Sequence, residues 1–115
     1  MIVTEADTAL SVGTGDVPVL ATPTLVLLCE RAALGAVADQ TDPGTTTVDH
    51  RVQLDHLAPT PIGGTVTADA VLESIEGRRL TFRVSVSDGH GLVAAGRITR
   101  VVVERERFLG RANAD

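Results

Sequence analysis

The 115-residue sequence predicts an α+β fold in which an antiparallel sheet of about five strands wraps one long central helix. Residues 19–37 form an almost unbroken apolar run of helical length. From residue 45 onward, apolar and polar residues alternate with the period of two that is typical of β-strands. A chain of this length has room for one compact domain, which we place at 1–115, with 105–115 as a tail.

The central helix is expected to begin with Thr22 as its N-cap and Pro23 as its first helical residue, where the missing N–H costs nothing. It should run to about Ala38, because Pro43 and Gly44 in the following segment cannot continue a helix. The run is apolar nearly all round, so we expect other structure to cover the helix.

One short strand is expected within residues 1–12 and four more after the helix. The first of these four, TTTVDHRVQLDH at 45–56, predicts two faces: Val48, His50, Val52, Leu54 and His56 on one, and Thr47, Asp49, Arg51, Gln53 and Asp55 on the other. Strand-like runs follow at 65–75, 80–87 and 92–104, separated by the hairpin-like segments EGRR and DGHG. This order of elements is that of the hotdog fold.

Composition and charge exclude several classes of function. A net charge of −5 repels phosphate backbones, and two Phe with no Trp or Tyr offer little for bases to stack on, so we expect no nucleic-acid partner. The single Cys29 excludes an internal disulfide, and the acidic N-terminus does not resemble a signal peptide. No apolar run approaches the ~18 residues of a membrane span. We therefore expect a soluble, cytoplasmic protein without a membrane partner.

Glu30 lies in the middle of the apolar run. Its helical neighbours at three and four residues are Val26, Leu27, Ala33 and Leu34, so no cation of its own helix is placed to pair with it. Such surroundings would raise the pKa of the carboxyl group and suit a general base or a nucleophile. The alternative is that Glu30 and Arg31 together mark an exposed edge of the helix.

Thr22 and His56 each have a structural alternative as well. The Thr22 hydroxyl can cap the helix by accepting from a free N–H and still donate its proton to a carboxylate or a substrate. His56 lies on the apolar face of its strand, where a lone histidine is more often a core residue than a catalyst. No metal site is expected, because the three His with Cys29 and Glu30 lack ligand spacing.

Three stretches resemble the fluoroacetyl-CoA thioesterase family of hotdog proteins, over roughly residues 4–104: GDVPVLATPTLVLLCE, DHLAPTPIGGTV and LESIEGRRLTFRVSVSDG. In that family a Thr at the helix start, a Glu eight residues later and a His at the end of the following strand form the catalytic set. The resemblance implies Thr22, Glu30 and His56 for these roles. The substrate-binding residues are expected within the same stretches, at Thr24, Gly63 and Gly64.

Two features differ from that family. Asp49 and His50 stand where it often has Gly-Thr. The aromatic lid of the specialised fluoroacetyl enzymes has no counterpart here, since no Phe precedes Phe82.

The predicted reaction is hydrolysis of a small acyl-CoA, with coenzyme A as part of the substrate and no other cofactor. Glu30 would activate water or attack the carbonyl directly, helix amides would stabilise the oxyanion, and His56 would protonate the leaving thiolate or position the acid. The alternatives are a hotdog hydratase or dehydratase acting on acyl thioesters, a non-catalytic acyl-CoA-binding module, and a structural role. The alternating segment TTTVDHRVQL predicts a homodimer by edge pairing, and higher homo-oligomers stay open.

Overall fold

The structure is a computed structural model and describes residues 1–114. Its elements are, in chain order, a 3₁₀ helix η1 (Glu5–Asp7), helices α1 (Ala9–Val12) and α2 (Thr22–Ala36), strands β1 (Thr45–His56), β2 (Thr67–Glu76), β3 (Arg79–Asp88) and β4 (Gly91–Glu104), and helix α3 (Arg105–Ala112). Within residues 1–114, no helix is both long and apolar enough to cross a membrane.

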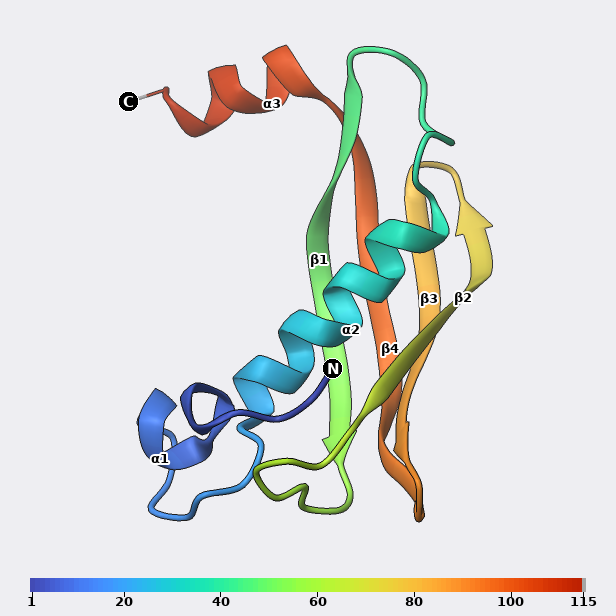
Figure 1. Ribbon diagram of the computed structural model, residues 1–115. Helices are drawn as coiled ribbons and strands as arrows, with labels where there is room; N and C mark the ends of the chain where they lie inside the picture. The colour runs from blue at the N-terminus through green and yellow to red at the C-terminus, as the bar shows by residue number, and fades with distance from the viewer. Residues whose placement is uncertain (115) are drawn as a thin grey trace.

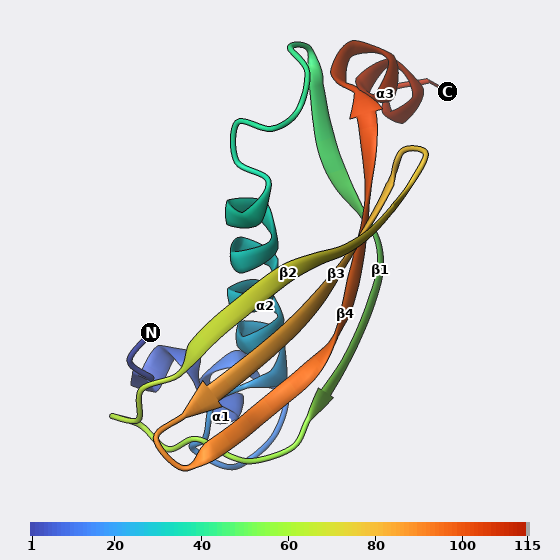
Figure 2. The same ribbon diagram turned by 90° about the vertical axis from the view of Figure 1, so that its right-hand side faces the viewer.

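The four strands form one antiparallel sheet in the order β1-β4-β3-β2, and α2 lies across one face of it (Figures 1 and 2). The predicted antiparallel sheet packed on a helix is therefore confirmed. The expectation of one long helix is wrong, because α2 has 15 residues and the chain also forms the short helices α1 and α3. Tight turns join β2 to β3 and β3 to β4. Gly77 in the first turn has a φ of 62°, and Gly91, the first residue of β4, has a φ of 140°. Such angles are strained for residues with a Cβ atom.

The core lies between α2 and the sheet. The helix contributes Leu25, Cys29 and Ala33, which recur every four residues on one face and are fully buried. The sheet contributes alternate residues of β3 and β4, mainly Phe82, Val84, Val86, Val93, Ala94 and Ile98. The opposite face of α2 is open, with Leu27 48% and Leu34 45% exposed. The expectation that this helix is covered all round is therefore not met within one chain.

The prediction of five strands is wrong, because residues 1–12 form no strand. Ile2 and Thr8 make only isolated bridges, to Thr65 and Leu20. Local side-chain bonds favour helical turns here: the Asp7 carboxylate accepts from the Thr4 amide at 2.8 Å, and the Thr8 hydroxyl caps α1 by accepting from the Ser11 amide at 3.2 Å. These short polar side chains compete with strand pairing for the backbone groups.

The predicted faces of β1 hold only for part of the strand. A β-bulge at His50 shifts the pairing with β4 between Asp49 and Arg51. Because an extra residue reverses the alternation, Leu54 and His56 face the helix as expected, but Thr47 and Asp49 face it too. The sequence pattern placed both on the opposite face.

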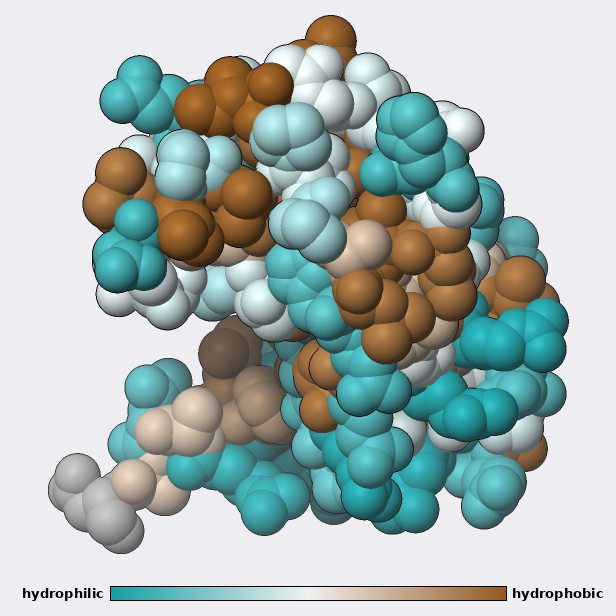
Figure 3. Space-filling model, turned by 90° about the horizontal axis from the view of Figure 1, so that it is seen from below, coloured by the Kyte–Doolittle hydropathy of each residue, from teal (hydrophilic) through white to brown (hydrophobic). Residues whose placement is uncertain are grey.

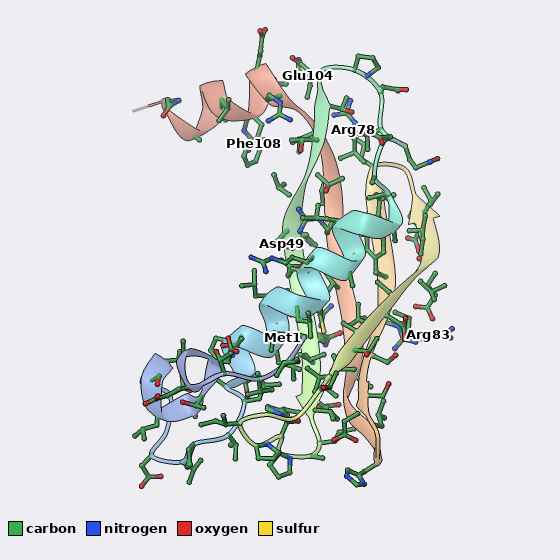
Figure 4. The ribbon with its side chains drawn as sticks, viewed as in Figure 1. Met1, Asp49, Arg78, Arg83, Glu104 and Phe108 are labelled. Atoms are coloured by element: carbon green, nitrogen blue, oxygen red, sulfur yellow. The ribbon has the colours of Figure 1, made fainter. Side chains whose placement is uncertain are left out.

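The two ends of the predicted helix also differ in detail. Ala21 is the N-cap, Thr22 is already helical, and α2 ends at Ala36 rather than Ala38. Of the expected tail, Arg105–Ala112 forms α3, which projects from the end of β4 and carries Phe108 away from the core (Figures 1 and 4).

Candidate active site

Thr22 and His56 meet at the start of α2. The Thr22 Oγ1 atom lies 2.7 Å from His56 Nδ1, and the pair joins the first helical residue to the last residue of β1. The Nε2 atom of His56 is buried and has no hydrogen-bond partner within residues 1–114. A hollow of about 230 Å³ borders this ring, with Val19, Leu57, Ala58 and Pro59 as its other lining residues.

The predicted capping role of Thr22 is wrong. Ala21 takes the cap position and α2 has no side-chain cap. The helix start therefore leaves the N–H groups of Thr22 and Thr24 without intrahelical partners, since hydrogen bonding begins with the Leu25 amide donating to Ala21 at 3.0 Å. Such N–H groups carry the positive end of the helix dipole and can stabilise an oxyanion.

Glu30 lies about two turns further along α2 and pairs with a cation from the sheet. Arg100 Nη1 lies 3.5 Å from Glu30 Oε2 and 2.7 Å from Asp49 Oδ1. The rest of the Arg100 head donates to Thr47, to its hydroxyl and its carbonyl oxygen, both at 2.9 Å. Figure 4 shows Asp49 on β1 beside the middle of α2. One buried guanidinium thus serves two carboxylates.

The Glu30 carboxyl group has a strongly perturbed pKa. Burial and the neighbouring Asp49 carboxylate together raise the pKa of Glu30 to about 7, against the opposing effect of Arg100. Its Oε1 atom is buried without a hydrogen-bond partner within the described chain. A carboxylate that titrates near neutral pH and keeps one oxygen free can accept a proton from water or attack a carbonyl carbon.

The structure does not bring all three predicted catalytic residues into contact within one chain. No hydrogen bond joins Glu30 to Thr22 or His56 among residues 1–114. Eight helical residues separate Glu30 from Thr22, about 12 Å along the axis. A single chain therefore presents two separate groups of polar side chains.

Cys29 precedes Glu30 on α2 and is buried in the core. Burial, reinforced by the Glu30 charge, raises the pKa of Cys29 to about 11, so its thiol is protonated at neutral pH and is a poor nucleophile. Among residues 1–114, no three His, Cys, Asp or Glu side chains are grouped to hold a metal ion.

Comparison with known proteins places this chain in a family. Residues 3–106 match the family model described as fluoroacetyl-CoA-specific thioesterase. The chain belongs to this family. The curated fluoroacetyl-CoA thioesterase of Streptantibioticus cattleyicolor is 41% identical over 90 residues, an alignment that covers 78% of this chain and 65% of that relative's length.

Solved structures agree with this assignment. A single-residue variant of the fluoroacetyl-CoA-specific thioesterase, in complex with fluoroacetate and CoA, is 35% identical with a TM-score of 0.85, covering 94% of this chain and 91% of that one. A hot-dog-like protein from Thermanaerovibrio acidaminovorans is 25% identical with a TM-score of 0.90, covering 97% and 83%. The predicted hotdog fold and family are confirmed.

The thioesterase family resemblance did not point to Arg100 or to the orientation of Asp49. One signal for Arg100 is visible in the sequence. It alternates with Ile98 and Val102 on the strand predicted at 92–104, so a cation stands on an otherwise apolar face. Asp49 had no such signal, because the bulge at His50 reversed its face.

The remaining residues expected to bind substrate have clear structural settings. Thr24 is half-buried in the first turn of α2. The Gly63 amide donates to the Val3 carbonyl oxygen at 2.8 Å, and Gly64 accepts from the Val3 amide at 2.9 Å. A Cβ at Gly64 would lie 2.7 Å from Thr60 Cγ2, so only glycine fits there. Both glycines thus anchor the N-terminal segment, and their contact with substrate stays a prediction.

Proposed function

We propose that this protein is an acyl-CoA thioesterase in which Glu30 acts as general base or nucleophile, assisted by Thr22 and His56. The observation that carries this proposal is the environment of Glu30: a part-buried carboxyl group with a pKa of about 7, a buried and unpartnered Oε1 atom and a guanidinium on its other oxygen. A solvent-exposed Glu at the edge of a helix would have none of these features.

The reaction follows from these groups. Glu30 would take a proton from water as the hydroxide adds to the thioester carbonyl, or would itself attack to give an anhydride. The N–H groups at the start of α2 would stabilise the oxyanion where a second subunit brings them to Glu30, because those of the same chain lie about 12 Å away along the helix axis. When the C–S bond breaks, His56 would protonate the thiolate, with its ring oriented by the Thr22 hydroxyl at 2.7 Å. No step uses a metal or a second cofactor.

The same proposal includes a homodimer. β1 is an edge strand of the sheet, and next to it the open face of α2 exposes Leu27 and Leu34. If β1 pairs with its own copy around the middle of the strand, Thr45 lies opposite His56 of the partner subunit. Because Glu30 lies at the level of Asp49 on β1, the partner's His56 is then closer to it along the strand than its own His56. Two subunits would complete each site.

Light scattering tests the dimer, with an expected mass of about 24 kDa, twice the 12.0 kDa of the chain. Mixing two inactive variants tests the shared site. Glu30→Gln and His56→Gln subunits should form heterodimers with one intact site, and equal mixing should restore about a quarter of wild-type activity. If the site lies within one chain, the mixture stays inactive.

A thiol-release assay with acetyl-, branched and longer acyl-CoA substrates tests the activity itself. Release of free CoA that requires Glu30 would support the proposal. An enoyl-CoA that is hydrated without thiol release would instead indicate a hydratase, and tight binding without turnover would indicate a binding module. The cytoplasmic location and the lack of a cofactor stay predictions, as does the identity of the acyl group.

A further inference from the structure

A cavity of about 390 Å³ lies beyond the end of α2, between the segment that leads to β1 and the β2–β3 hairpin. Its inner wall is apolar and consists of Val37, Leu72, Leu80 and Val102, all of which pack against the core. Its outer rim is exposed and mostly polar, with Gln40, Thr41 and Asp42, and it also includes the exposed Ile75. Neither the family resemblance nor the proposed catalytic groups account for this cavity, and its size lies within the range of small-molecule sites.

The cavity adjoins the Glu30 cluster on three elements. Val37 follows Glu30 by seven residues, so both lie on the same side of α2, about 10 Å apart along the axis. On the sheet, Thr45 and Val102 line the cavity and stand two residues from Thr47 and Arg100, on the same face. A chain that extends about 10 Å from Glu30 along the helix face of the sheet, beside the buried Arg100, would therefore reach the cavity.

The charges along this path favour an uncharged, apolar occupant. Arg100 already carries two carboxylates, Asp49 at 2.7 Å and Glu30 at 3.5 Å, so a further anion would find no free cation in the cluster. Beyond it the inner wall offers only aliphatic side chains, which stabilise a hydrocarbon by excluding water. A dicarboxylic acyl group would have to bury its second charge there, at high cost.

We propose that this cavity binds the hydrocarbon end of a medium-chain acyl group whose thioester carbonyl lies at Glu30. The inference rests on the proposed thioesterase function for the position of the carbonyl. It names the substrate class as CoA thioesters of uncharged acyl groups longer than acetyl. A second copy of the chain is the competing occupant and is one outcome of the test below.

Binding of S-alkyl-CoA thioethers, from methyl to octyl, tests the cavity without requiring hydrolysis. Isothermal calorimetry should show affinity rising about fourfold per added methylene, the factor that corresponds to about 0.8 kcal/mol, until the cavity is full. A flat series across chain length would overturn the proposal. Because no bond is broken, this result is independent of the thiol-release assay. Affinity that rises with chain length, without any turnover of acyl-CoA, would contradict the thioesterase activity but support binding of the hydrocarbon chain in the cavity.

Val102→Phe and Val101→Phe form a matched pair, since adjacent strand residues point to opposite faces. Filling the cavity with Val102→Phe should lower octyl-CoA affinity at least tenfold and change methyl-CoA affinity less than twofold, whereas Val101→Phe should change neither. Leu72→Phe fills the same cavity from β2 and should repeat the result if Val102→Phe fails to fold. An unchanged octyl affinity in a folded filling variant overturns the proposal. The proposal is also overturned if a filling variant loses the dimer mass but keeps the same preference for acyl-chain length. The cavity would then bind a second copy of the chain.

Discussion

The two polar groups along α2 differ in how the fold assembles them. Thr22 and His56 make one hydrogen bond at the ends of two elements, where the helix start is exposed. Glu30, Arg100 and Asp49 form a cluster of three charges in the middle of the helix face, and two of its members are 70 residues apart in the chain. The first group orients an imidazole ring through one hydrogen bond, whereas the second holds a carboxylate whose charge burial makes costly. A strongly perturbed general base is therefore expected at the second group, and an oriented proton donor at the first.

The largest effect is expected at Glu30. Glu30→Gln preserves volume and removes the base, so kcat/KM for the best acyl-CoA should fall by about 10² to 10⁴ while the fold survives. Glu73→Gln is the matched control, because Glu73 also pairs with an arginine, Arg97 at 2.7 Å, but on an exposed surface. It should leave turnover unchanged. Full turnover by Glu30→Gln would remove the catalytic assignment.

The sequence could predict those features of the two polar groups that depend on residues close together in the chain, but not those that depend on residues far apart. The helix and the four long strands follow from local periodicity, and the family stretches named all members of the first group. The pairing of Glu30 with Arg100 could not be predicted, because strand register and a bulge at His50 decide which side chains face the helix. One inserted residue reversed the face of Asp49 without changing the alternating pattern.

The lack of a fifth strand has a similar cause. Residues 1–12 contain short apolar runs, but the side chains of Asp7 and Thr8 bond to nearby backbone groups and close short helical turns. Whether such local bonds prevail over strand pairing depends on whether a partner strand is available, and the sequence alone does not show this.

A smaller effect is expected at Thr22. Since Thr22 is not the N-cap, Thr22→Ala should hardly change the melting temperature, and it should lower kcat/KM about tenfold through loss of one hydrogen bond to His56. Thr22→Ser keeps the hydroxyl and should retain most activity. The measurements are thermal melts and steady-state kinetics of both variants. A clear loss of stability in Thr22→Ala with normal activity would return the residue to a structural role.

The smallest effect, and the one that separates the two groups most sharply, is expected from Asp49→Asn. If deprotonated Glu30 is the base, kcat/KM of the wild type should fall on the acid side with an apparent pKa of about 7. The Asp49 carboxylate raises the pKa of Glu30, whereas Arg100 lowers it. Asp49 also binds Arg100 and so competes with Glu30 for this cation. Removing the Asp49 charge ends the repulsion and releases Arg100 toward Glu30. Both changes favour the ionised form, so the acid limb should move to lower pH.

Asp55→Asn is the control for this shift, because Asp55 is an exposed carboxylate of the same strand that faces away from α2. Its pH profile should match that of the wild type. His56→Gln tests the alternative that His56 sets the acid limb of kcat/KM. In that case the limb would vanish in His56→Gln and would not respond to Asp49→Asn. An acid limb that stays in place in Asp49→Asn would mean that the Glu30–Arg100–Asp49 cluster does not set the pH dependence, and the titrating group would then belong to the Thr22–His56 pair.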